Sequence, residues 1–169
     1  QSVPTNIVTN TDIESITNGS NADWIHDKLG ILERRISTND NVVTLGVESA
    51  REAMHDAGIL PTEIDLIIVN TSSPDKVSPS VACMIQNQIG AECPSFDINA
   101  VCSGFLYSME LVGNLLSTYN NILMISTETY SKITDWGDKN SCFFGDGSAS
   151  LVIAKSHNSN LDVTLGADG

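Results

Sequence analysis

Residues 64–71 read Ile-Asp-Leu-Ile-Ile-Val-Asn-Thr, and this stretch indicates the fold more directly than any other. Its apolar residues follow one another without alternation, and most of them are β-branched. A strand that is apolar on both faces is typical of a parallel sheet covered by helices on each side. We therefore expect a buried central strand here, within an α/β protein.

Helical and strand patterns alternate on either side of this strand. A helix is predicted from about residue 42 to 57, where apolar side chains recur at helical spacing and Gly58 ends it. Ser78 and Pro79 are expected to begin another helix, as N-cap and first residue, and Gly90 to end it. Further helices are expected at 21–29 and 102–118, and further strands at 33–37, 95–101, 121–127 and 149–154. This βαβαβ order predicts a layered α/β fold with a largely parallel sheet.

Gly145-Asp146-Gly147 separates two apolar runs, residues 141–144 and 149–154. No Gly-Lys-Ser/Thr follows it, so it does not match a phosphate-binding loop. Asp-Gly between apolar runs is typical of a hairpin. We predict a tight turn that joins two antiparallel strands.

Length and charge limit the class of protein. A chain of 169 residues predicts one domain. Its formal net charge of −13 disfavours nucleic acid and anionic membrane surfaces as partners, because both attract basic proteins. No apolar run approaches the roughly 20 residues of a membrane span, and the first residues show no signal-peptide pattern. Four cysteines without metal-ligand spacing indicate reduced thiols in a cytoplasmic protein that holds no metal.

Cys102 is the first candidate for chemistry, because it lies between a predicted strand and a predicted helix. The helix macrodipole and the free N–H groups at a helix start favour the thiolate, the reactive form of cysteine. Gly104 is expected to let a substrate approach the backbone. The alternative is a small buried cysteine that only packs at the junction. Packing alone is expected for the other cysteines, Cys83, Cys93 and Cys142.

Trp24 and Lys28 form a second candidate group. One helical turn separates an aromatic ring from a cation, a pair that can stack on a purine and meet a phosphate. The alternative is an ordinary surface patch. Arg34 and Arg35 lie nearby in the sequence, and they add to a local basic concentration that an anionic ligand would need.

A set of collinear motifs spans Val3 to about Ser156 and carries a family resemblance. The motifs are Trp24-Ile25 with Gly30-Ile31 and Glu33-Arg34-Arg35; Ala57-Gly58-Ile59; residues 64–69; residues 71–75 (TSSPD); residues 79–83 (PSVAC); residues 96–105 (FDINAVCSGF); and residues 144–147 (FGDG). Together they resemble β-ketoacyl-acyl-carrier-protein synthase III, of the thiolase-like superfamily. The resemblance implies one half of that family's duplicated fold, a mixed, mostly parallel sheet with helices on both faces.

The resemblance also implies an activity in fatty-acid biosynthesis or a related pathway. Such condensing enzymes are acyltransferases that move an acyl group from acyl-coenzyme A to a cysteine and condense it with malonyl-acyl carrier protein. Cys102 matches the nucleophile, and Trp24 matches the residue that stacks on the adenine of coenzyme A. Lys28 and Lys139 fall where the family usually has arginines beside that adenine. The resemblance further implies a homodimer, with the strand before Cys102 at the two-fold axis, and no cofactor besides the coenzyme A substrate.

The family nucleophile works with a His and an Asn that lie in the second half of a chain about twice this long. His26, His55 and His157 match no such motif. We therefore interpret residues 1–169 as a single N-terminal thiolase-like domain, truncated at both ends, that cannot complete the condensation alone. The alternative function is that of a non-catalytic structural partner with the same fold in a heteromeric synthase.

Overall fold

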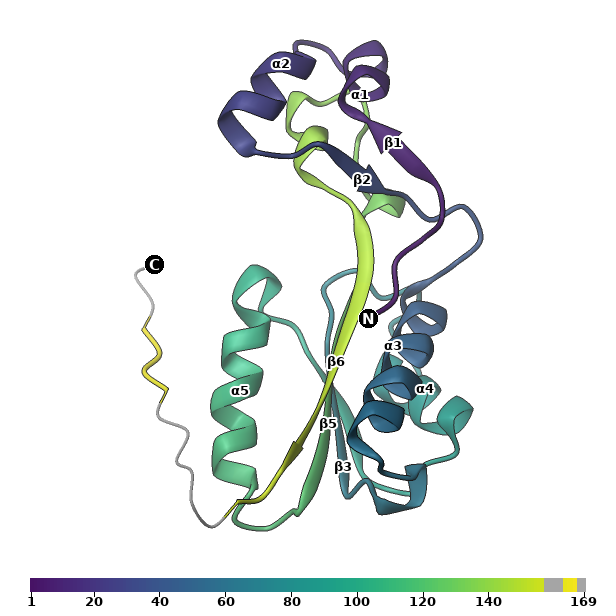
Figure 1. Ribbon diagram of the computed structural model, residues 1–169, viewed down its shortest axis with the longest axis vertical. Coiled ribbons are helices and arrows are strands. Elements are labelled where there is room, and N and C mark those ends of the chain that lie inside the picture. Colours follow the sequence, from purple (N-terminus) through teal and green to yellow (C-terminus); the bar gives the residue numbers. More distant parts are fainter. Residues whose placement is uncertain (157–162, 167–169) are drawn as a thin grey trace.

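A four-stranded sheet forms the centre of the computed structural model, which describes residues 1–156 and 163–166 (Figure 1). Its strand order is β4 (Ser95–Ile98), β3 (Leu66–Asn70), β5 (Asn121–Thr129) and β6 (Asp146–Ala154). β3 pairs in parallel with both of its neighbours, and β6 pairs antiparallel with β5. The predicted mixed, mostly parallel sheet is confirmed.

Helices cover both faces of this sheet (Figure 1). On one face lie α3 (Val42–Ala57) and α4 (Val81–Ile89), and on the other lies α5 (Gly104–Leu115). Every residue of β3 is buried. Ile67 and Val69 pack with α3 and α4, whereas Leu66 and Ile68 pack in the cluster that includes α5. The uninterrupted apolar run in the sequence is therefore one strand that supplies two cores.

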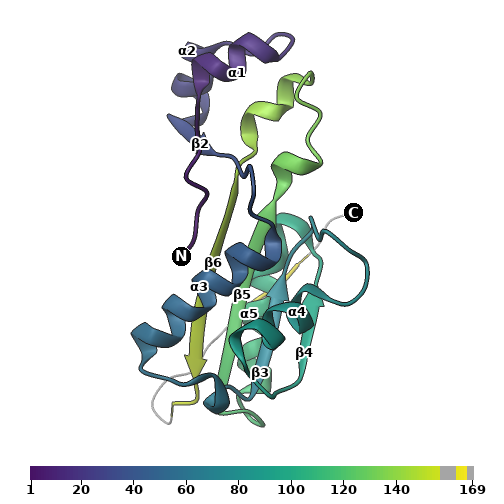
Figure 2. The same ribbon diagram turned by 90° about the vertical axis from the view of Figure 1, so that its right-hand side faces the viewer.

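A smaller lobe stands at the end of the sheet from which β6 starts (Figure 2). It contains an antiparallel pair of strands, β1 (Ile7–Thr9) and β2 (Glu33–Arg35), and a small core around Ile13, Ile25 and Cys142. Its helical elements are α1 (Asn10–Ile16), α2 (Ala22–Trp24), a π-helical turn at Ile25–Leu29 and 3-10 turns at Tyr130–Lys132 and Lys139–Phe143. The lobe thus joins the N-terminal segment to residues 130–143, which connect β5 to β6.

The helix ends at Gly58 and Gly90 were predicted correctly, since both residues take the left-handed conformation at a C-cap. The predicted start of α4 was wrong by two residues, and Ser78 and Pro79 lie outside the helix. Ser80 is the N-cap, and the Asp97 carboxylate accepts hydrogen bonds from the N–H groups of Val81 and Ala82 at 2.8 and 2.7 Å. A carboxylate from the neighbouring strand therefore caps this helix, which local sequence does not reveal.

The hairpin predicted at Gly145-Asp146-Gly147 does not form. Residues Lys139–Phe143 are a 3-10 turn, so Cys142 does not open a strand, and Asp146 begins β6, which pairs with β5. The buried Asp146 carboxylate accepts hydrogen bonds from the Ser37 N–H at 2.7 Å and from the Ser131 N–H and hydroxyl at 2.9 and 2.5 Å. The motif therefore anchors three segments instead of turning the chain.

The predicted elements on either side of Cys102 differ at their ends from the observed ones. The strand before Cys102 stops at Ile98, and α5 begins at Gly104 after a separate 3-10 turn at Val101–Ser103. Another 3-10 turn, Pro61–Glu63, precedes β3. No helix within the described part of the chain is long and apolar enough to span a membrane.

The Asp146 carboxylate provides a stability test. Replacing Asp146 by Ala leaves the donors of Ser37 and Ser131 without their acceptor, and each buried, unsatisfied donor costs about 1–3 kcal/mol. We expect Asp146→Ala to lower the free energy of unfolding by more than about 2 kcal/mol in urea denaturation. Asp56→Ala, on the exposed side of α3, is the control and should change it by less than about 0.5 kcal/mol. Equal stability of the two variants would contradict this role of Asp146.

Candidate active site

Cys102 lies in the 3-10 turn between β4 and α5, and its side chain is exposed. The preceding residue, Val101, has a φ of +48°. A β-branched residue is a clear outlier in this region, and such strain costs about 1–3 kcal/mol and collects at functional sites. The sequence placed the thiol correctly between strand and helix, and the packing alternative does not describe it.

A cavity of about 660 Å³ opens beside the thiol. It is formed where the carboxyl ends of β3 and β5 meet the start of α5, the edge at which open α/β sheets bind ligands. The residues that line it are Asn70, Ser72, Val101, Cys102, Phe105, Ser126, Glu128, Tyr130, Phe143 and Phe144. Several of these are polar residues at or after the end of an apolar strand, a signal that the sequence analysis did not use.

Gly104 does not serve the purpose predicted from sequence. A Cβ on this residue would come within 1.8 Å of the Asn70 Oδ1 atom. The space beside the Gly104 backbone is therefore filled by a side chain of this protein, and it is not open to a substrate. Glycine is required here because β3 and α5 approach so closely.

Glu128 holds the segment that follows β3. Its carboxylate accepts hydrogen bonds from the Ser72 N–H at 2.8 Å, from the hydroxyls of Ser72 and Thr71 at 2.9 and 3.3 Å, and from the Ser73 hydroxyl. The Ser72 hydroxyl also lies 2.9 Å from the Tyr130 hydroxyl. One carboxylate on β5 thus fixes the rim of the Cys102 cavity.

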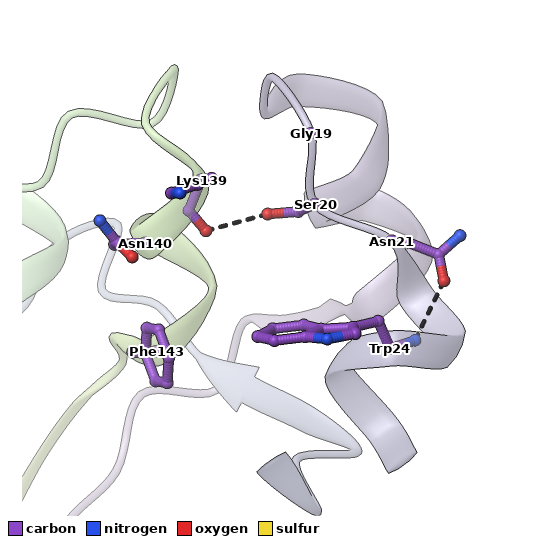
Figure 3. Close-up of a pocket in the computed structure, with 7 residues that line it drawn as sticks. All are labelled: Gly19, Ser20, Asn21, Trp24, Lys139, Asn140 and Phe143. Carbon is purple, nitrogen blue, oxygen red and sulfur yellow. Dashed lines mark hydrogen bonds between the residues drawn. The ribbon is translucent and has the colours of Figure 1, made fainter. Parts of the chain in front are cut away.

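A second cavity, of about 510 Å³, lies in the smaller lobe (Figure 3). Trp24 and Lys139, far apart in the sequence, both line it. The Ser20 hydroxyl donates a hydrogen bond to the Lys139 carbonyl oxygen at 3.0 Å. The Asn21 side-chain oxygen accepts one from the backbone N–H of Trp24, also at 3.0 Å. Trp24 is 47% exposed, which leaves its ring available to a ligand.

The same structure separates Lys28 from this group. Lys28 is exposed on the π-helical turn and does not line the cavity. Phe143 lines both this cavity and the one beside Cys102. One aromatic side chain thus lines both cavities, of which one is also lined by Trp24 and the other by Cys102.

Arg34 and Arg35 do not add to a basic binding patch, contrary to the interpretation from sequence. Arg34 is buried and donates hydrogen bonds to the Asn10 side chain at 2.8 Å and to the carbonyl oxygens of Val8 and Cys142, each at 3.3 Å. Burial lowers the pKa of its guanidinium. Arg35 donates to the Pro4 carbonyl oxygen. Both side chains hold the smaller lobe together.

The other cysteines differ from one another. All four thiols are free; Cys142 is buried, Cys93 is partly buried, and Cys83 is exposed, so packing alone does not describe Cys83. Hydrogen bonds from the hydroxyls of Ser80 and then Ser95 lower the pKa of the Cys83 thiol.

Among the described residues, no histidine lines either cavity. His26 and His55 are exposed and lie beside Asp27 and Asp56. His157 lies outside the described residues. The described part of the chain also holds no cluster of His, Cys, Asp and Glu that could bind a metal ion.

Known proteins are similar to this chain in sequence and in architecture. Residues 96–169 match the family described as 3-oxoacyl-[acyl-carrier-protein (ACP)] synthase III. The chain is 44% identical to the beta-ketoacyl-[acyl-carrier-protein] synthase III of Clostridium acetobutylicum, over 99% of this chain and 53% of that protein. It is 46% identical to the protein of the same name from Clostridium botulinum strain Hall, over 90% of this chain and 48% of that protein.

Solved structures agree. The crystal structure of 3-oxoacyl-[acyl-carrier-protein] synthase III from Aquifex aeolicus superposes with a TM-score of 0.87 at 38% identity, over 92% of this chain and 52% of that one. The priming β-ketosynthase of the R1128 polyketide pathway superposes with a TM-score of 0.86 at 29% identity, over 92% and 48%. The chain resembles the β-ketoacyl-acyl-carrier-protein synthase III family in sequence and has the thiolase-like fold of these solved structures. It spans about half the length of these relatives.

The cysteine environments generate a pH-dependent prediction. Burial, and secondarily the charge of Asp65, raise the pKa of the Cys93 thiol, whereas that of Cys83 is lowered. Because the thiolate is the form that reacts, iodoacetamide should alkylate Cys83 at a lower pH than Cys93. Site-resolved mass spectrometry across a pH series measures both profiles. Ser80→Ala should move the Cys83 profile to higher pH and leave that of Cys93 in place; coincident profiles would contradict these environments.

Proposed function

We propose that this chain carries the acyl-accepting site of a β-ketoacyl-acyl-carrier-protein synthase III, with Cys102 as the nucleophile. The observation that carries the proposal is that Phe143 lines two cavities, one at the exposed Cys102 thiol and one at Trp24 and Lys139. A thioester whose adenine stacks on Trp24 is proposed to extend past Phe143 to the thiol. This division of the ligand fits the roles that the family resemblance implies.

Coenzyme A binding is proposed to rest on Trp24 and Lys139. The indole ring supplies the stacking surface, and the Lys139 ammonium supplies a positive charge for phosphate in a chain that is otherwise strongly acidic. Lys28, which does not line the cavity, is proposed as a second cation for the ligand. A lysine binds phosphate as a point charge and lacks the planar fork of arginine, so orientation of the adenine depends mainly on Trp24.

Acyl transfer then follows from the position of Cys102 before α5. The Cys102 thiolate attacks the carbonyl carbon of the acyl thioester, and the oxyanion that forms is stabilised by backbone N–H groups at the turn. The new sulfur–carbon bond replaces the bond to coenzyme A, which leaves as a thiol after taking up the proton that Cys102 lost. No metal or other cofactor takes part in this step.

Condensation with malonyl-acyl carrier protein is proposed to need groups from outside this chain. Decarboxylation of the malonyl thioester leaves an enolate whose charge must be met by placed donors, and in the family a His and an Asn supply them. Neither His26 nor His55 lines the Cys102 cavity. Exposed apolar residues beside Cys102, among them Phe105 and Leu106, support a covering second half of the length that the relatives have.

Acyl transfer is tested by incubating the chain with acetyl-coenzyme A and mapping adducts by mass spectrometry. We expect an acetyl group at Cys102 and none at the exposed Cys83, which lies outside the cavities. Trp24→Ala should raise the acetyl-coenzyme A concentration needed for half-maximal labelling about tenfold, because stacking on a base contributes about 1–3 kcal/mol.

Leu32→Ala, an exposed apolar truncation in the same lobe, is the matched control and should leave labelling unchanged. Carbon dioxide release from malonyl-acyl carrier protein should stay at background in the same samples. Equal acetylation of Cys83 and Cys102 would count against the nucleophile, and rapid decarboxylation would count against the division of roles between the two halves.

A homodimer is proposed through β4. This strand is at the edge of the sheet, and among the described residues it pairs only with β3. An open strand edge of this kind is a template for pairing with a second copy. Light scattering over a series of micromolar concentrations should therefore give the mass of a dimer. A monomer mass across the series would contradict the proposal.

A further inference from the structure

The Asn70 side chain is buried, but its hydrogen-bonding groups are poorly satisfied. It ends β3 and is 6% exposed, yet its Oδ1 atom has no hydrogen-bond partner among the described residues. Its Nδ2 atom makes one long hydrogen bond, 3.4 Å, to the Ser126 hydroxyl on the paired position of β5. A buried, unsatisfied carbonyl is unfavourable, so an apolar residue of similar size would serve the core better.

The contact that Asn70 does make is with the segment that carries Cys102. A Cβ at Gly104 would come within 1.8 Å of Oδ1, 2.5 Å of Cγ and 2.9 Å of Nδ2 of Asn70. The carboxamide therefore packs against the first residue of α5, with its Oδ1 atom nearest to the position of the added Cβ. Asn70 and Cys102 also line the same cavity.

The backbone between them is held in an unfavourable conformation. Val101, directly before Cys102, keeps a positive φ that a β-branched residue avoids. Such a conformation persists only where neighbouring groups fix the chain on both sides. Asn70 is placed where it could provide that restraint from the sheet, because it ends the fully buried β3 and packs against Gly104.

We infer that Asn70 is a positioning residue for Cys102: its carboxamide, packed against Gly104, holds the strained turn that fixes the thiol at the start of α5. The inference rests on the proposed function, because it concerns the reactivity of that thiol. It extends beyond it by assigning a role to a residue that need not touch the substrate. Polar residues that fit poorly in a core are expected at functional sites.

The test measures the rate of iodoacetamide alkylation of Cys102 relative to Cys83 in the 169-residue chain, by site-resolved mass spectrometry. Asn70→Ala should lower this ratio about tenfold or more, since a displacement of about 1 Å at a reacting group has effects up to ~10²-fold. Gly104→Ala should lower it as well, because its methyl group displaces the Asn70 side chain. The double variant Asn70→Ala/Gly104→Ala places that methyl group in the space left by the amide, and its ratio should return to within about threefold of wild type.

Thr127→Ala is the matched control. It also removes a buried polar side chain from the sheet, one whose hydroxyl donates to the Val42 carbonyl oxygen at 2.8 Å, but away from Cys102. A purely structural role for Asn70 would lower the stability of Asn70→Ala, as Thr127→Ala does, and leave the ratio at its wild-type value. If Gly104→Ala does not fold, as judged by circular dichroism, Asn70→Ala against Thr127→Ala decides the question.

An unchanged ratio in Asn70→Ala, or a double variant no faster than the slower single variant, would overturn the inference. Failure of the proposed function is a separate result. If acetyl-coenzyme A does not acetylate Cys102 in the wild type, the proposed function fails, while the alkylation ratios still report whether Asn70 positions the thiol.

Discussion

The structure depends above all on the burial of β3 on both faces. Its alternate side chains enter two separate apolar clusters, and both of its edges are hydrogen-bonded to parallel strands. A strand held in this way has no freedom to shift, because a slip of one residue would exchange the two sets of side chains. The carboxyl end of β3 is therefore the most firmly located point near the candidate active site.

A small number of contacts connect the rigid end of β3 to the segment that carries Cys102. Asn70 at the end of β3 packs against Gly104, and Glu128 on β5 collects the hydroxyl and N–H groups of the segment that follows β3. The thiol itself sits on a short turn that is exposed and strained. Rigid strands thus support an exposed thiol on a turn, an arrangement that allows access without loss of position.

The few positive charges of the chain have distinct roles. The chain is strongly acidic, and two of its arginines are used inside the smaller lobe, where Arg34 joins β1, the start of α1 and the turn that contains Cys142. An anionic ligand in the Trp24 cavity therefore meets Lys139 against a background of negative charge. Such a background favours a ligand that brings both a stacking ring and a phosphate over one that brings charge alone.

The sequence by itself determined the buried strand β3 and the mostly parallel character of the sheet, the ends of α3 and α4 at Gly58 and Gly90, and the position of Cys102 between strand and helix. These features are local: burial on two faces, a left-handed cap and a strand–helix junction each leave a pattern within a few residues. Tertiary structure alone decided that Asp97 caps α4, that Asp146 anchors β6, that Arg34 is buried and that Lys139 meets Trp24. Each of these depends on which segments come together, and no spacing along the chain encodes a partner that lies 15 or more residues away. The approach of Asn70 to Gly104 belongs with them, because the fit of one carboxamide against one glycine exists only once β3 and α5 have packed.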